Sequence, residues 1–138
     1  MNRESLNDLS RIAWAALRMF MTKTLNTESM PAAAQVIQTH GNLLSVNPHV
    51  HCIVADGLFK TSGTFVKMPK YSEQARRALQ AVFEQKVANY CLARGFVRPE
   101  TIQKRLTWQY SGFSVWLNDR QYASMSLCIT IETKIKKN

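Results

Sequence analysis

The sequence predicts an α+β domain, in which an antiparallel sheet is flanked by helices. Two stretches, residues 4–22 and 72–95, carry apolar residues at three- and four-residue steps, the period of an amphipathic helix. Between and after them run short segments rich in β-branched residues and bounded by turn signals. Because these strands and helices do not alternate regularly along the chain, an antiparallel sheet is expected and a parallel one is not.

The N-terminal part predicts one helix and the start of the sheet. The helix is expected over residues 4–22, with an N-cap at Asn2 or Ser5. Its apolar face consists of Leu6, Leu9, Ile12, Ala13, Ala16, Leu17 and Phe20. Polar residues and a proline then interrupt the helical pattern, and strands are expected over residues 32–40 and 49–54.

The rest of the chain predicts a hairpin, two helices and further strands. Residues 58–68 form the hairpin, because a loop containing glycine joins two short apolar segments. The second helix is capped by Ser72 and stopped by Gly95, and Pro99 suits the first turn of a third. A strand is expected in the segment SGFSVWL. Another is expected in the tail, where Leu127, Ile129 and Ile131 alternate with Ser126, Thr130 and Glu132.

Composition limits the class of protein. A chain of 138 residues, 46% of them hydrophobic, fits one soluble globular domain. No run approaches the roughly 18 apolar residues of a membrane span, and no secretory signal opens the sequence. Cys52, Cys91 and Cys128 form no CxxC pair, so neither a disulfide framework nor a zinc ribbon is expected. We therefore expect a cytoplasmic protein without a membrane partner or a small-molecule substrate.

Positive charge is concentrated in the second half of the chain. Residues 1–69 carry six basic and four acidic residues, a net charge of +2, and residues 70–138 carry twelve and five, a net charge of +7. A basic half indicates a polyanionic partner, most often nucleic acid. The alternative is a small basic protein that binds no DNA.

Two histidines stand one residue apart at the start of the predicted strand 49–54. Side chains alternate along a strand, so His49 and His51 project to one face while Val50 projects to the other. Their Cα atoms would lie about 7 Å apart, close enough for both imidazoles to reach one cation. The alternative is a pair of ordinary, half-exposed histidines without a metal.

The neighbourhood of this pair resembles a known family. The segment QVIQTHGNLLSVNPHVHCIVADGLF resembles the corresponding part of the two-tyrosine, rolling-circle transposases of bacterial insertion sequences. Those enzymes belong to the His-hydrophobe-His (HUH) single-strand endonucleases, with plasmid relaxases and replication initiators (Rep proteins). The positions that match are Gln38, Gly41, Asn47, Pro48, His49, Val50, His51, Asp56 and Gly57.

A second block downstream is also similar to the family. It is the tryptophan and SGFSV signature formed by Trp108, Ser111, Gly112, Phe113, Ser114 and Val115. The resemblance spans about residues 6–120. We therefore divide the chain into a partial transposase core, residues 1–120, and a divergent C-terminal tail, residues 121–138.

The resemblance implies a fold, a cofactor and a chemistry. The fold would be the HUH-endonuclease (Rep/relaxase-like) architecture in incomplete form. His49 and His51 would bind a divalent cation, Mg²⁺ or Mn²⁺, with Gln38 on the preceding strand as the candidate third ligand. The alternative for Gln38 is a strand-end amide that caps the backbone. The activity would be nicking and strand transfer of single-stranded or nicked DNA at the element's ends, with a tyrosine taking a 5′-phosphate and leaving a free 3′-hydroxyl. The cation would act on the phosphate as a Lewis acid.

The chain departs from the family pattern in two respects. It has Tyr110 and Trp116 where the family has histidine, and it contains no Tyr-x-x-x-Tyr pair. Tyr122 is the one tyrosine in roughly the region of the family's nucleophiles, and the alternative is that it is a surface or core aromatic residue. The cysteine-rich zinc segment of many relatives is absent as well. These departures indicate a truncated member, and they leave open whether the chain is an active transposase or a catalytically dead DNA-binding remnant.

Four basic residues are the candidates for DNA contacts. Arg76 and Arg77 fall on the second predicted helix, and Lys104 and Arg105 on the third, all within the basic half. The alternative is a solvated helix face that contacts only water.

Overall fold

A computed structural model describes residues 3–40, 46–106, 113–118 and 126–133 of the chain, with side chains for residues 3–39, 49–104 and 115. The elements follow in the order α1 (Arg3–Leu25), β1 (Met30–His40), β2 (Val46–Phe59), β3 (Phe65–Lys67), α2 (Glu73–Ala93), α3 (Pro99–Leu106), β4 (Phe113–Asn118) and β5 (Ser126–Thr133).

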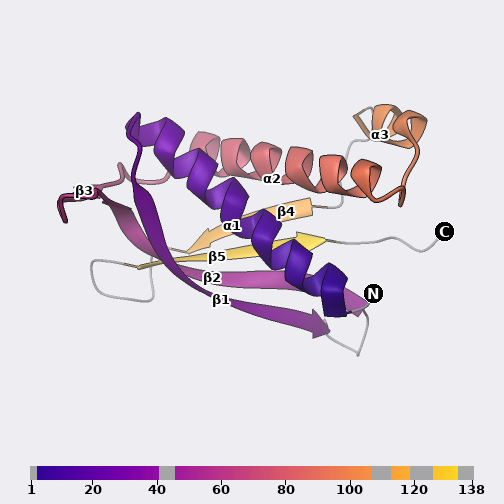
Figure 1. Cartoon of the computed structure of the whole chain (residues 1–138), viewed down its shortest axis with the longest axis horizontal. Coiled ribbons are helices and arrows are strands. Elements are labelled where there is room, and N and C mark those ends of the chain that lie inside the picture. Colours follow the sequence, from indigo (N-terminus) through magenta and orange to yellow (C-terminus); the bar gives the residue numbers. More distant parts are fainter. Residues whose placement is uncertain (1–2, 41–45, 107–112, 119–125, 134–138) are drawn as a thin grey trace.

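The strands form one antiparallel sheet, so the predicted α+β class is confirmed. The strand order is β1-β2-β5-β4, and β3 pairs with the far end of β2. Helices α1 and α2 lie across the same face of this sheet (Figure 1). The arrangement is consistent with the incomplete HUH-type architecture that the family resemblance implies. The opposite face carries no helix among the described residues.

The core fills the space between the two long helices and the sheet. Buried apolar side chains on α1 are Leu9, Ala13, Ala16, Leu17, Phe20 and Met21, and on α2 they are Leu79, Phe83 and Val87. These positions recur every three or four residues, so each helix buries one stripe. A polar contact also joins the two helices: Tyr90 Oη of α2 donates a hydrogen bond of 2.8 Å to Asp8 Oδ2 of α1. Arg94 pairs with the same carboxylate at 3.1 Å.

The predicted ends of α2 agree with the structure. The Ser72 hydroxyl accepts a hydrogen bond of 3.1 Å from the Ala75 amide, which satisfies an N–H that the first turn leaves free. Past the other end, Gly95 takes a φ of +69°, a conformation that glycine adopts without a steric penalty. Neither α2 nor any other helix in the described ranges is long and apolar enough to cross a membrane.

Strand β2 carries the alternation on which the site depends. Val50, Cys52 and Val54 are at most 1% exposed and face the helices, whereas Ile53 is 50% exposed and faces away. The prediction that Val50 points inward is therefore confirmed. The predicted hairpin is also confirmed, since β2 and β3 pair with Phe59 opposite Phe65.

The alternating residues of the C-terminal segment form a strand at the centre of the sheet. Strand β5 pairs with β2 on one side, Val50 opposite Ile131, and with β4 on the other, Val115 opposite Ile131. The domain boundary at residue 120 stays a prediction, but the segment beyond it contributes to the same sheet as the core.

Candidate metal site

The two histidines of interest lie side by side on the open face of β2. Their ring centroids are 4.8 Å apart and their planes meet at 79°, an edge-to-face arrangement. His49 is 7% exposed although none of the described helices covers it, and His51 is half-buried. Since Val50 between them is fully buried, the backbone cannot rotate one ring away without disturbing the core.

Gln38 of the neighbouring strand completes a small polar cluster. In the β1–β2 register it is directly opposite His49, so both side chains occupy the same face of the sheet. Its Oε1 atom lies 3.3 Å from Nε2 of His51. The strand pairing therefore brings together the three residues that the family resemblance named as ligands.

The donor set is compatible with one divalent cation. Two imidazoles bound to the same ion have ring centroids no more than roughly 6.4 Å apart, given metal–nitrogen bonds of about 2.1 Å, and the observed separation lies within this limit. The carboxamide oxygen adds the harder donor that Mg²⁺ or Mn²⁺ prefers. No group of three or more His, Cys, Asp or Glu side chains gathers anywhere in the described part of the chain.

Strand pairing adds one residue that sequence reasoning did not single out. Glu132 of β5 is directly opposite His49, on the side of β2 away from Gln38. The alternation of the tail placed Glu132 on the polar face of its strand. The partner strand could not be inferred, because β2 and β5 are about seventy residues apart and local pattern carries no information on such pairing.

The described tyrosines lie on the other side of the sheet. The ring of Tyr71 stacks on Phe20 of α1 with centroids 6.4 Å apart, and Tyr90 is bonded to Asp8 of the same helix. Burial is the main cause that raises the pKa of Tyr71, and the charge of Asp56 adds to it. Both phenols are therefore separated from the histidines by the sheet. The candidate nucleophile Tyr122, like Tyr110, lies outside the described residues.

Comparison with known protein families decides the assignment. The family model Y2_Tnp, described as "Putative transposase", matches residues 33–136. The chain belongs to this transposase family. No curated protein and no solved structure matches the chain. The match includes both β2, with its histidines, and β5, so the segment after residue 120 is part of the region shared with this family.

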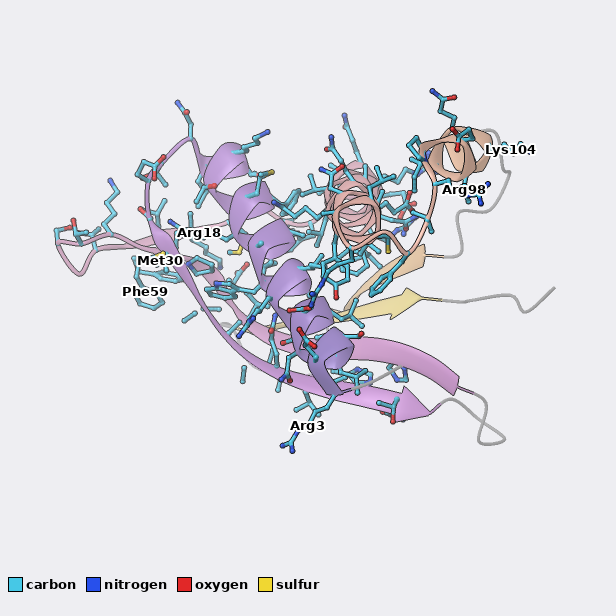
Figure 2. The ribbon with its side chains drawn as sticks, turned by 45° about the vertical axis from the view of Figure 1, so that its right-hand side comes forward. Arg3, Arg18, Met30, Phe59, Arg98 and Lys104 are labelled. Atoms are coloured by element: carbon cyan, nitrogen blue, oxygen red, sulfur yellow. The ribbon has the colours of Figure 1, made fainter. Side chains whose placement is uncertain are left out.

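Membership of the Y2_Tnp family gives the chain a transposase-like function and makes DNA its class of partner. The four basic residues proposed for DNA contacts lie on α2, which covers the face of the sheet opposite the histidines, and on α3, which follows beyond the end of α2 (Figure 1). Figure 2 shows Lys104 beside α3, at the edge of the molecule. The side chain of Arg105 lies outside those that the structure describes.

The two arginines of α2 differ in their surroundings. Arg76 donates to the Val115 carbonyl of β4 at 3.0 Å and to both Glu73 oxygens at 2.7 and 2.8 Å, so its guanidinium joins helix to sheet. Arg77 contacts only Glu73 among the ion pairs of the described residues, and its side chain is 75% exposed. Of the two, Arg77 is thus the more accessible to a phosphate of the DNA that this transposase family handles.

Proposed function

We propose that this transposase nicks single-stranded DNA and transfers the strand through a divalent cation held by His49 and His51. The observation that supports the proposal most directly is the shared orientation of the two imidazoles beside the Gln38 carboxamide. The residues belong to two strands whose register is fixed by buried neighbours, so the donors are positioned before any ligand binds.

The roles of the residues follow from their chemistry. His49 and His51 supply two nitrogen donors, and Gln38 supplies an oxygen donor. When bound, the cation supplies Lewis acidity at the scissile phosphate. Its expected identity is Mg²⁺ or Mn²⁺, because an oxygen donor completes the set.

The nicking step exchanges one phosphoester for another. A tyrosine oxygen bonds to the scissile phosphorus, the bond to the 3′-oxygen breaks, the phenol loses its proton and the 3′-oxygen gains one. The products are a 5′-phosphotyrosine and a free 3′-hydroxyl, which can attack the phosphotyrosine later to rejoin DNA. Tyr71 and Tyr90 are held on the helical side. Of the two other tyrosines, only Tyr122 follows the SGFSV block, as the family's nucleophilic tyrosines do, so Tyr122 is the proposed nucleophile.

The test is covalent capture together with metal titration. The chain is incubated with Mn²⁺ and end-labelled single strands from the termini of its own element, and adducts are resolved on a denaturing gel. We expect an adduct that disappears in Tyr122→Phe and in His49→Ala. Calorimetric titration with Mn²⁺ should show one site that His49→Ala and His51→Ala each remove. Gln35→Ala, on the other face of β1, is the matched control and should retain it.

The alternative function is a catalytically dead, DNA-binding remnant of a transposase. The positions of Tyr71 and Tyr90 support this reading, since neither can reach the histidine face. A chain that binds Mn²⁺ and single-stranded DNA but never forms an adduct would establish it. A chain that binds DNA with no dependence on salt would count against both readings, because phosphate contacts release counterions.

A further inference from the structure

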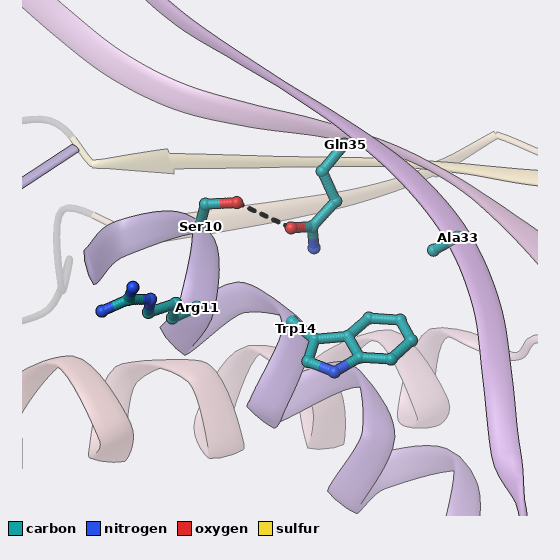
Figure 3. Close-up of a pocket in the computed structure, with 5 residues that line it drawn as sticks. All are labelled: Ser10, Arg11, Trp14, Ala33 and Gln35. Carbon is teal, nitrogen blue, oxygen red and sulfur yellow. Dashed lines mark hydrogen bonds between the residues drawn. The ribbon is translucent and has the colours of Figure 1, made fainter. Parts of the chain in front are cut away.

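A second surface feature, remote from the histidines, lies between α1 and β1. Ser10, Arg11 and Trp14 of α1 and Ala33 and Gln35 of β1 line a groove of about 370 Å³, which we call the α1–β1 groove (Figure 3). This volume is at the lower end of the range for small-ligand sites, roughly 300–1,000 Å³. Gln35 is opposite the buried Cys52, so the groove opens on the helical side of the sheet, away from His49 and His51.

The groove exists because a small residue stands opposite a large one. Ala33 of β1 leaves the space beside the indole of Trp14 unfilled, and Figure 3 shows the ring lying between helix and strand. The indole is half-buried and packs on the core, so its orientation is fixed. Strand β1 lies at the edge of the described sheet, so no further described strand borders the groove on that side.

Polar groups surround this aromatic surface. The Gln35 carboxamide forms the floor, where its Oε1 accepts a hydrogen bond of 2.7 Å from the Ser10 hydroxyl. Arg11 lies at the rim, with a side chain 82% exposed and, among the ion pairs of the described residues, one contact of 3.6 Å to Asp8. Arg18, also exposed, follows two turns later on the same side of α1, about 10 Å along the helix.

We infer that the α1–β1 groove binds one base of single-stranded DNA, stacked on Trp14, while Arg11 and Arg18 contact the backbone phosphates. A fixed aromatic face with cationic groups along its rim is the combination by which proteins hold single strands without reading their sequence. The two exposed arginines on this side of α1, Arg11 and Arg18, favour an anionic occupant with regularly spaced charges, such as a phosphate backbone. The inference rests on single-stranded DNA as partner, as the proposed function does, but not on the metal site.

The test measures the affinity for a fluorescein-labelled oligothymidylate by anisotropy at fixed salt, without divalent cation. Trp14→Ala should weaken binding by roughly 5- to 100-fold, the usual value of one stacked base, and Trp14→Phe should weaken it far less. Because Trp14 also packs on the core, Ala33→Leu provides a second variant, which fills the groove from the exposed strand. It should weaken binding to a similar degree.

Two controls separate this site from general electrostatics and from the histidine site. Arg11→Gln should weaken binding more than Arg98→Gln, an equal loss of charge beside α3 (Figure 2). The assay contains no divalent cation, so the histidine site does not contribute metal-mediated binding to the measured affinity. If Ala33→Leu and a folded Trp14→Ala keep wild-type affinity, the groove is not a base site, whatever the metal site does. If the wild type binds no single strand at all, this inference and the proposed function both fail.

Discussion

Gln38 Oε1 of β1 lies 3.3 Å from His51 Nε2 of β2, and the same glutamine is the register partner of His49. One amide thus contacts one imidazole and shares a face with the other. We therefore expect Gln38→Ala to weaken Mn²⁺ binding by roughly tenfold, the lower end of the effect of losing a group that orients metal ligands. Gln38→Glu should strengthen binding, because it adds a negative oxygen donor. Calorimetric titration of both variants, beside Gln35→Ala, checks the prediction. Equal weakening by Ala and Glu would contradict a ligand role for the oxygen.

The positions of the described tyrosines predict which substitutions leave nicking intact. Tyr71→Phe and Tyr90→Phe should both keep wild-type adduct formation, because each phenol is on the helical side of the sheet. Tyr71→Phe should also leave stability unchanged or raise it by about 1 kcal/mol. The reason is that the buried hydroxyl has no hydrogen-bond partner among the described groups. The denaturing-gel assay and thermal melts measure the two effects. Loss of the adduct in Tyr71→Phe alone would instead indicate that the nucleophile lies on the helical side of the sheet, away from His49 and His51.

The neighbouring arginines of α2 should respond differently to substitution. Arg76→Ala removes the bond to the Val115 carbonyl and both bonds to Glu73, so it should lower the stability by about 1 kcal/mol and the Tm by a few degrees. Arg77→Ala should leave Tm unchanged, because its single contact with Glu73 is exposed. The affinity for an oligonucleotide should show the opposite order: Arg77→Ala should lose more affinity than Arg76→Ala. Thermal melts of the two variants measure the change in Tm, and anisotropy titrations measure the change in oligonucleotide affinity.

Stability should fall at acid pH because two carboxylates are held ionised. Hydrogen bonds from Tyr90 and Arg94 lower the pKa of Asp8 below its ordinary 3.8, and bonds from Arg76 and Arg77 lower the pKa of Glu73 from 4.5 to about 2. A lowered pKa in the folded state stabilises the protein above the ordinary value, and this contribution is lost as the pH falls through the folded value. The Tm should therefore decrease between pH 4.5 and about 2.

Tyr90→Phe isolates the part of this effect that belongs to Asp8. The variant keeps the ring but removes the hydroxyl, which is the largest cause of the lowered pKa. The Asp8 pKa should rise toward its ordinary value, and the acid-dependent fall in Tm should become smaller. Thermal melts from pH 7 to pH 2 measure the fall, and carboxyl NMR measures the pKa directly. An identical pH profile in the two proteins would show that the Tyr90 bond has no energetic effect.

Local pattern predicted the site's orientation but not its full composition. Alternation around Val50 sufficed to place both histidines on one face, because burial of every second residue leaves a strand only one orientation. The start of β1 at Met30, two residues before the predicted strand, results from its pairing with Phe59, which no local pattern contains. The role of Arg76 was also missed, since its partner Val115 is 39 residues away and offers only a backbone carbonyl. Pairing across such distances is decided by tertiary packing.

Gly57 follows the predicted strand 49–54 in the sequence, but the strand observed in the structure extends past it. Residue 57 lies within β2, opposite Lys67 of β3, and not in a turn. A Cβ at Gly57 would overlap the Val66 carbonyl oxygen and lie 2.5 Å from Phe65 Cζ. We therefore expect Gly57→Ala to separate β3 from β2 and to cost about 1–3 kcal/mol in chemical denaturation, as overpacking does.

A double variant distinguishes the cause of this loss. Phe65→Ala clears the aromatic atom but not the carbonyl oxygen, so adding it to Gly57→Ala should restore little of the stability. Recovery to the level of Phe65→Ala alone would instead show that the ring was the obstacle.

Gly63→Ala is the comparison within the same hairpin. Nothing lies within 4 Å of its Cβ position, and its φ of +82° makes any loss there purely conformational, about 1 kcal/mol. Because β3 pairs with β2 at the end remote from the histidines, all four variants should still bind Mn²⁺.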